Sequence, residues 1–152
     1  MIETLPTIEE TLIKVKDDVL ELDEEWAFVK KKINKRWLWI AISRATRQVV
    51  AYFIGDRTKE SCQKFEEKIP ERYKETFKFS DLWDSYNAVF PENHKSVDKN
   101  SGETCHVERF NNTIRQRLSR YTRKTLSFSK SDYWHDLVTH LFIIHYNLSL
   151  KI

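Results

Sequence analysis

The sequence predicts an α/β or α+β fold in which helices cover a mixed β-sheet. Three observations support this prediction. The predicted elements run in the order three strands, helix, strand and further helices, apolar residues alternate in the first part of the chain, and they recur at helical spacing in the last part. The 152 residues suffice for one domain, and we find no internal repeat or linker.

The first three predicted strands follow one another closely. Residues 19–29 (VLELDEEWAFV) alternate in polarity and carry Asp23 on the polar side. A polar turn is expected at 30–35, a strand that is apolar on both faces at 36–42, and a third strand at 49–54. Because the links between them are short, these strands favour an antiparallel meander.

The later elements are predicted from capping residues and apolar spacing. Thr58 is a plausible N-cap, and Pro70 would stop the helix that follows it. In chain order we expect a helix over 58–68, a short strand over 77–81 that ends in an acid, a short helix over 82–90, a polar loop with one short strand over 92–103, a helix over 105–120, and a last helix opened by Ser129-x-x-Asp132, which resembles a capping box.

Composition excludes several classes of protein. With 40% hydrophobic and 32% charged residues, the chain has a globular composition. No apolar run is long enough to span a bilayer, and the N-terminus lacks the pattern of a signal peptide, so we expect a cytosolic protein. Cys62 and Cys105 form no CxxC motif, and two cysteines are too few for a cysteine zinc ribbon.

The positive charge is concentrated in one segment. The chain has 26 basic and 23 acidic residues, a net charge of +3. Six bases and no acid lie between positions 109 and 124, so the rest of the chain holds 20 bases against 23 acids. Such a basic strip is typical either of a solvated helix face or of a surface that contacts nucleic-acid phosphates.

Three acids occupy positions that point to chemistry. Asp23 lies inside a predicted strand, Asp81 ends another, and Glu108 lies in the helix of the basic strip. At about 100° per residue, Glu108 shares one helix face with Asn112 and Arg115. Three carboxylates suit Mg²⁺, and two such ions support phosphodiester chemistry, although spacing alone permits many other triples among 23 acids.

Seven segments carry a resemblance to a known family. They read ELDEEW (21–26), KRWLW (35–39), VVA (49–51), GDRT (55–58), SDLW (80–83), HVERFNNTIRQRL (106–118) and RKTLSFSKS (123–131). Together they resemble the catalytic, InsB-type half of the insertion-sequence-one (IS1) family of transposases, over about residues 19–150. The last two segments are the most specific.

The resemblance implies a ribonuclease-H-like fold and a DDE catalytic triad. The triad residues would be Asp23, Asp81 and Glu108, with Arg115 as the basic residue two turns after the glutamate and Asp84 as the alternative for the middle acid. The triad would hold two Mg²⁺, with Mn²⁺ as a substitute. DNA phosphates would be bound by the polar residues of the basic strip, which are Arg109, Asn112, Arg115, Arg117, Arg120, Arg123 and Lys124.

The family also implies partners and an order of reactions. Cleavage at a transposon end would free a 3′-hydroxyl, which then attacks target DNA. We expect residues 1–18 to form an arm and 19–152 the catalytic domain, with zinc-finger and helix-turn-helix recognition supplied by an upstream frame product or fusion. The expected substrate is double-stranded DNA, on which the protein would assemble as a homo-oligomer. The expected location is the prokaryotic cytoplasm at the nucleoid, with no membrane contact. A non-catalytic regulatory partner of the full-length enzyme and a metal-dependent nuclease are the alternatives.

Overall fold

The structure is a computed structural model that describes residues 5–29, 31–118, 121 and 131–151, and within it the side chains of residues 28–34 are not described. Its elements are η2 (Glu9–Thr11), β1 (Val19–Val29), β2 (Lys31–Ser43), β3 (Val49–Gly55), α1 (Lys59–Lys68), η3 (Glu71–Tyr73), β4 (Phe77–Ser80), α2 (Asp84–Val89), β5 (His94–Ser96), η4 (Lys99–Ser101), α3 (Cys105–Arg117) and α4 (Asp132–Ser149).

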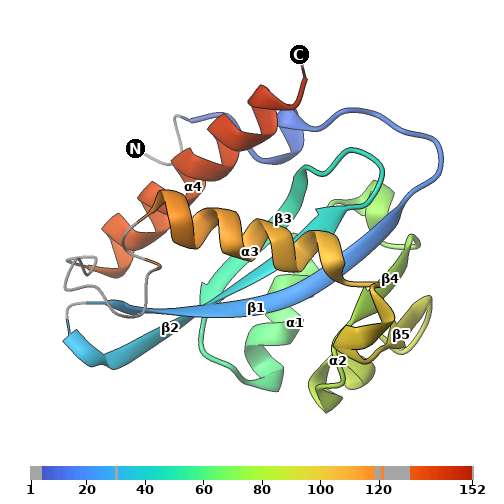
Figure 1. The fold of residues 1–152 in the computed structure, drawn as a ribbon, viewed down its shortest axis with the longest axis horizontal. Coiled ribbons are helices and arrows are strands. Elements are labelled where there is room, and N and C mark those ends of the chain that lie inside the picture. The colour runs from blue at the N-terminus through green and yellow to red at the C-terminus, as the bar shows by residue number, and fades with distance from the viewer. Residues whose placement is uncertain (1–4, 30, 119–120, 122–130, 152) are drawn as a thin grey trace.

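The strands form one mixed sheet, in the order β3-β2-β1-β4-β5 (Figure 1). β1 pairs with β2, and β2 with β3, in antiparallel fashion, so the predicted meander is confirmed. β4 joins β1 in parallel, and β5 joins β4 in parallel. The central strand β1 therefore has the meander on one side and the shorter strands on the other.

The predicted polar turn at 30–35 is wrong, because β2 already begins at Lys31. Its early residues continue the ladder with β1, where Phe28 pairs with Lys35 and Val29 with Lys31 across a register shift. Backbone pairing with a long partner strand does not require apolar side chains. The polar residues 31–35 therefore do not indicate that the two strands stay paired beyond the apolar core.

The N-cap of α1 is the residue predicted from the sequence, whereas the N-cap of α4 is not. The Thr58 hydroxyl accepts a hydrogen bond from the amide of Ser61, as expected for the N-cap of α1. The last helix is capped instead by Ser131, whose hydroxyl accepts from the amide of Trp134, so the prediction of a cap at Ser129 is wrong. Ser129 itself lies outside the described residues. α3 ends at Arg117 because Leu118 has an extended backbone.

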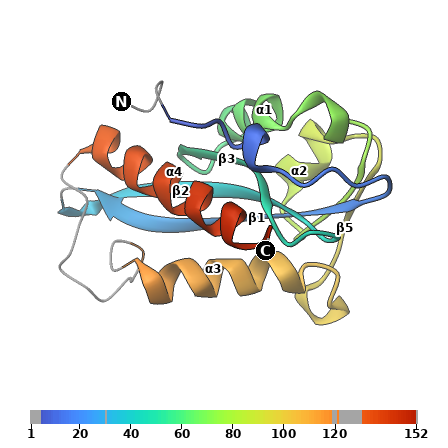
Figure 2. The ribbon, with the colours of Figure 1, turned by 90° about the horizontal axis from the view of Figure 1, so that it is seen from above.

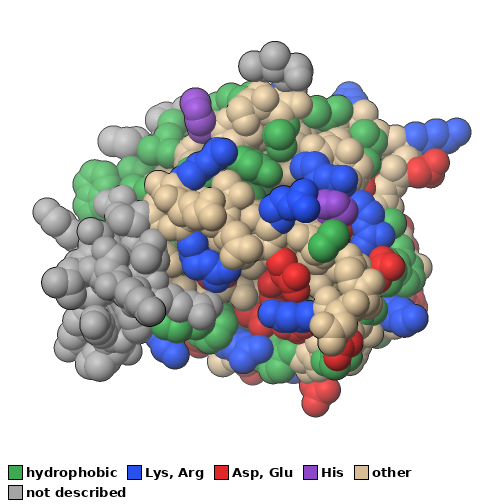
Figure 3. Space-filling model, viewed as in Figure 1, with side chains coloured by type: hydrophobic (Ala, Val, Ile, Leu, Met, Phe, Trp, Pro, Cys, Tyr) green, Lys and Arg blue, Asp and Glu red, His purple; other side chains and the backbone are tan. Residues whose placement is uncertain are grey.

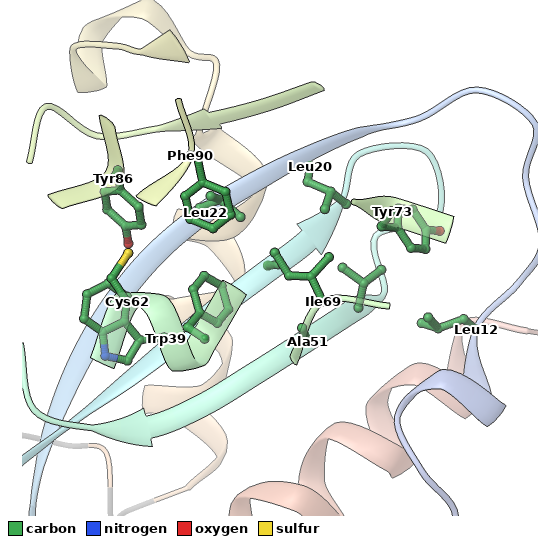
Figure 4. Packing of buried hydrophobic residues seen from close by; sticks show 13 residues of the cluster. Leu12, Leu20, Leu22, Trp39, Ala51, Cys62, Ile69, Tyr73, Tyr86 and Phe90 are labelled. Atoms are coloured by element: carbon green, nitrogen blue, oxygen red, sulfur yellow. The ribbon is translucent and has the colours of Figure 1, made fainter. Parts of the chain in front are cut away.

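Two apolar layers hold the sheet between its helices (Figure 2). The alternation of β2 divides its side chains between them, since Trp39 and Ala41 lie on the side of α1 and α2, and Ile40 lies on the side of α3. Figure 4 shows the first layer, where Trp39 packs with Cys62, Tyr86 and Phe90. The second layer is built from Val107, Phe110 and Ile114 of α3, together with Leu38, Ile40, Ile42, Val49, Tyr121 and Ile143.

The N-terminal segment is bound to the domain by buried polar contacts. The Asn147 amide of α4 donates to the Thr11 hydroxyl (2.9 Å) and to the Val49 carbonyl (2.8 Å). The Gln48 amide donates to the carbonyls of Thr11 and Asn147. These contacts fix α4 and the segment around Thr11 against the β3 edge. In the described part of the chain, no helix is long and apolar enough to cross a membrane.

Candidate active site

Strand register brings two of the predicted acids together. β1 and β4 run parallel, with Val19 opposite Phe77 and Glu21 opposite Phe79. The same offset of 58 positions (77 − 19) places Asp81 opposite Asp23, just past the end of β4. β4 stops at this point while β1 continues, so the two carboxylates meet at an open strand edge.

A cluster of three carboxylates occupies this edge. Ligand oxygens of Asp23, Glu24 and Asp81 all lie within 4.8 Å of one another. The Asn111 amide donates to Asp23 Oδ2 (3.2 Å), and the backbone amide of Trp83 donates to Asp81 Oδ1 (3.1 Å). The cluster is therefore held from both sides of the sheet, by α3 and by the turn before α2. Figure 3 shows acidic side chains at the surface where β1 passes below α3.

Glu24 was not predicted as a site residue. Its side chain points to the α1 and α2 side of the sheet, where it is only 3% exposed. The Tyr86 hydroxyl donates to Oε2 (2.5 Å), and Arg57 donates to Oε1 (3.0 Å). The Arg57 guanidinium in turn stacks on the rings of Trp37 and Trp83, at 5.0 and 4.9 Å from their centroids. These contacts hold the Glu24 carboxylate in a fixed position beside Asp23.

Glu108 lies near the cluster without joining it. It occupies the first turn of α3, where the Thr104 hydroxyl donates to its Oε1 (3.4 Å). Its charge contributes to the electrostatic environment of Asp23. Within the described residues, Glu108 belongs to no group of three potential ligands whose atoms all lie within 4.8 Å. The structure thus brings together Asp23 and Asp81 closely, and Glu108 at a greater distance.

The position of α3 is fixed by another buried acid. Glu21 Oε1 accepts from the backbone amides of His106 (2.8 Å) and Val107 (3.1 Å), at the first turn of the helix. Oε2 is bound by Arg44 and by the His106 ring. Glu21 therefore acts as the N-terminal cap of a helix 85 positions away, and this contact sets where Glu108 stands over β1. Glu21, Cys105 and His106 also have ligand atoms within 4.8 Å, but the Glu21 carboxylate already makes four hydrogen bonds, with Arg44, His106 and Val107.

Arg115 has a partner on the sheet. Its Nη1 lies 2.8 Å from Oε1 of Glu25, a β1 residue whose side chain is 1% exposed. It also donates to the side chain of Asn112, its neighbour one turn earlier. Glu21, Asp23 and Glu25 alternate along β1 and all face α3, and each is matched by polar groups of that helix. Of these three acids, only Asp23 was predicted from the sequence as a site residue.

Replacing Arg115 by Ala is expected to destabilise the domain by about 3 kcal/mol, because it leaves the buried Glu25 carboxylate without its ion pair. Chemical denaturation at pH 7 measures the change. Arg117→Ala, exposed on the same helix, is the control and should change the free energy of unfolding by less than about 0.5 kcal/mol. Adding Glu25→Gln to the Arg115 variant should restore much of the loss. Equal stabilities of the two arginine variants would remove this role of Arg115.

The other predicted site residues lie outside the carboxylate cluster, and those that the structure describes are exposed. Arg109, Asn112 and Arg117 are exposed on α3. Arg120, Arg123 and Lys124 lie outside the described residues, so that half of the basic strip stays a prediction. Asp84, the alternative middle acid, is exposed at the start of α2 and takes no part in the carboxylate cluster.

Burial and mutual repulsion make the cluster a site that favours positive charge. Burial, with the charges of Asp81 and Glu108 adding to it, raises the pKa of Asp23 to about 6. Burial and the charges of Asp23 and Asp81 raise the pKa of Glu24 to about 7, against the lowering effect of Tyr86 and Arg57. Asn111 Oδ1, buried beside Asp23, has no hydrogen-bond partner among the described residues. An all-oxygen donor set of this kind fits a hard divalent cation such as Mg²⁺.

These raised pKa values predict how stability depends on pH without metal. The unfolded chain releases the two protons near pH 4, from ordinary pKa values of 3.8 and 4.5, whereas the folded protein keeps them to about pH 6 to 7. The folded state therefore binds more protons in this window, and its stability falls as pH rises from about 4 to 7. For Asp23 alone the loss is about 3 kcal/mol.

Urea denaturation of the wild-type chain and of Asp23→Asn at a series of pH values, in EDTA, measures this dependence. The Asn variant should gain stability relative to wild type as pH rises. A difference that stays constant between pH 4 and 7 would contradict the raised pKa of Asp23.

Comparison with known proteins now adds to this geometry. Residues 18–148 match the family described as IS1 transposase. The chain belongs to the IS1 transposase family. It is 37% identical to the insertion element iso-IS1n protein InsB of Shigella dysenteriae over 125 residues, which cover 82% of this chain and 93% of that protein. It is 35% identical to the IS1 protein InsB of Shigella flexneri, over 83% of this chain and 95% of that protein. The resemblance found in the sequence is thereby confirmed.

A solved structure extends the comparison to the fold of this IS1-family protein. The catalytic core domain of HTLV-2 integrase, determined in complex with magnesium in a trimeric form, matches with a TM-score of 0.52 and 15% identity. The match covers 87% of this chain and 82% of that one. The predicted ribonuclease-H-like fold, a mixed sheet with flanking helices, is confirmed. Family and fold together make the chain a transposase domain of the catalytic type.

Proposed function

We propose that this IS1-family chain cuts and joins DNA strands at the ends of an insertion element, using divalent metal ions at the carboxylate cluster. The observation that carries the proposal is the meeting of Asp23, Glu24 and Asp81 within 4.8 Å, at an open strand edge and close to Glu108. A cluster of acids that repel one another is unfavourable unless a cation binds there. We therefore assign cation binding to this cluster.

Asp23 and Asp81 would hold the metal, with Glu24 and Glu108 as the two candidates for further ligands. Two Mg²⁺ ions bound at such a site, or Mn²⁺ in their place, would activate an attacking oxygen and stabilise the leaving one. The magnesium complex of the integrase core supports this choice of ion. In this chain, Asn111 orients the Asp23 carboxylate, and Tyr86 and Arg57 orient Glu24.

The outer face of α3 is the proposed DNA-binding surface. Arg109 and Asn112 are exposed there near Glu108, and Arg117 is exposed at the last residue of the helix. Guanidinium groups bind phosphate through two parallel hydrogen bonds, which holds a DNA backbone without reading its sequence. Arg120, Arg123 and Lys124 would extend this surface. Arg115, which is bound to Glu25, would stabilise the helix and contribute less than the exposed arginines to phosphate binding.

Sequence-specific binding is the part of the reaction that we assign elsewhere. Recognition of the element ends is proposed to come from an upstream zinc-finger and helix-turn-helix frame product, in the same chain or in a fusion. The active assembly would be a homo-oligomer on double-stranded DNA at the nucleoid.

Metal removal tests the proposal directly. The chain is fused to the product of the upstream reading frame and incubated with labelled DNA duplexes that carry the ends of its insertion element. Strand cleavage is expected with Mg²⁺ or Mn²⁺, none with EDTA, and recovery when Mg²⁺ is restored. DNA binding should persist in EDTA, because phosphate contacts do not need the metal. Binding without cleavage under every metal condition would favour the regulatory alternative, and equal cleavage of unrelated duplexes would favour a general nuclease.

A further inference from the structure

The outward face of α4 is apolar, which is unusual for a surface helix. Trp134, Leu141 and Leu148 are 49%, 43% and 45% exposed. They point away from the face that packs on the domain, where Ile143 and Asn147 are buried. A helix on the surface of a soluble domain normally has a polar outer face, and one that is apolar all round is normally buried. In Figure 3, hydrophobic side chains lie along the part of the surface where α4 runs.

The exposed side chains follow a heptad pattern. Val138 and His145 lie between them, so the seam advances by 4, 3, 4 and 3 residues through positions 134, 138, 141, 145 and 148. At about 100° per residue, these five positions lie within a band of about 80° on the helix. Alternating steps of three and four are the spacing at which one α-helix packs along another. The other large exposed apolar residues of the described chain are Tyr133, which lies on α4 outside this seam, and Val15, Phe77 and Leu82, which lie elsewhere in the chain.

The charges of α4 argue against other partners. The helix contains no lysine or arginine, and its two acids, Asp132 and Asp136, are bound to Arg36 and Tyr52. A nucleic acid or an anionic membrane surface would require basic residues along this face. Among the described residues from position 105 onwards, the lysine and arginine side chains lie on α3, except for Lys151, which follows the end of α4. Apart from His145, the seam is apolar, and it contains no lysine, arginine, aspartate or glutamate, so it is complementary to a second seam of the same kind.

We propose that two copies of this chain associate through α4, with the seam of residues 134, 138, 141, 145 and 148 packed against its equivalent across a two-fold axis. Identical patches meet in such an interface, so the seam needs no second kind of surface. Its side chains would bury on the order of 400 Å² per copy. This total of roughly 800 Å² is below the 1,200 Å² typical of stable interfaces, so the free dimer is weak. Two copies held on one DNA molecule would associate more strongly through their high effective concentration.

α3 packs beside α4 through ring contacts of Phe110 with Phe142 and Tyr146. The seam is separate from the carboxylate cluster, because it belongs to α4, whereas the cluster belongs to β1 and the residue that follows β4. In the view of Figure 1, α3 lies between α4 and β4. Pairing through α4 therefore leaves both candidate active sites open. The inference concerns the free protein and holds whether or not the proposed cleavage activity does.

Sedimentation equilibrium of the 152-residue chain, without DNA or metal, tests the proposal. The mass should rise with protein concentration from 18.4 kDa towards twice that value. Leu141→Glu should weaken the association by at least roughly 30-fold, because two half-exposed leucines are lost from the centre of the seam. The matched control is Leu82→Glu, a more exposed leucine (61%) outside α4, which should associate like wild type.

Cross-linking supplies a second measurement that does not depend on the stability of a charged variant. In a Cys105→Ser background, which removes the exposed native thiol, Leu141→Cys should be joined into dimers by a short bis-maleimide, and Leu82→Cys should not. A chain that stays at 18.4 kDa at several hundred micromolar would overturn the proposal. So would an association that Leu141→Glu and Leu82→Glu weaken equally.

Discussion

Replacement of Asp23 by Asn is expected to abolish strand cleavage, by about 10³-fold or more, while DNA binding is retained. Asp23 is the carboxylate that the rest of the site surrounds, since it lies within 4.8 Å of Glu24 and Asp81 and its pKa responds to the charge of Glu108. Asparagine keeps the volume and can still accept the hydrogen bond from Asn111. The loss would therefore report the missing charge rather than a disturbed fold.

The matched control for this experiment is Asp84→Asn, an exposed acid three residues after Asp81. It should cleave like wild type, because Asp84 takes no part in the carboxylate cluster. Metal affinity, followed by titration calorimetry with Mn²⁺, should fall in the Asp23 variant and stay unchanged in the control. If Asp84→Asn lost cleavage and Asp23→Asn did not, the active site would have to be sought around α2 instead.

Much of the fold could be predicted because local patterns and tertiary packing agree. β1 was predicted with its observed bounds, since its polarity alternates with the two-residue period of a strand. The cap at Thr58 and the short strand before Asp81 were also found. The turn predicted at 30–35 was wrong because pairing with β1 makes Lys31 the start of a strand despite its polar neighbours. The cap of the last helix was wrong because the sequence offers two serines, Ser129 and Ser131, and the structure uses Ser131. Such choices depend on contacts that no local window contains.

The candidate site was predictable in part for the same reason. Asp23 and Asp81 could be found because each stands at a strand position where a charge needs a partner. Glu24 was missed because alternation assigns it to the opposite face, and only the early end of β4 lets both side chains reach one edge. Glu21 and Glu25 could have been found from a simple signal. Acids at alternate positions of one strand face imply that the element packed on that face supplies partners.

Glu24 and Glu108 are expected to separate metal affinity from cleavage. Glu24 already lies within 4.8 Å of Asp23 and Asp81, whereas Glu108 does not share that distance to both. In the DNA-free chain, Glu24→Gln should weaken Mn²⁺ binding by about 10- to 100-fold, and Glu108→Gln by much less. On DNA, Glu108→Gln should lower cleavage by about 10³-fold, because we propose Glu108 as the third acid of the triad.

Glutamine preserves volume in both variants and can still accept hydrogen bonds, from Tyr86 and Arg57 at position 24 and from Thr104 at position 108. Differences between the variants therefore report the charge. Glu92→Gln, an exposed acid in the loop before β5, is the control and should change neither measurement. If Glu24→Gln binds Mn²⁺ like wild type while Glu108→Gln loses binding, Glu24 is not a ligand. In that case α3 must carry Glu108 closer to Asp23 when the metal binds.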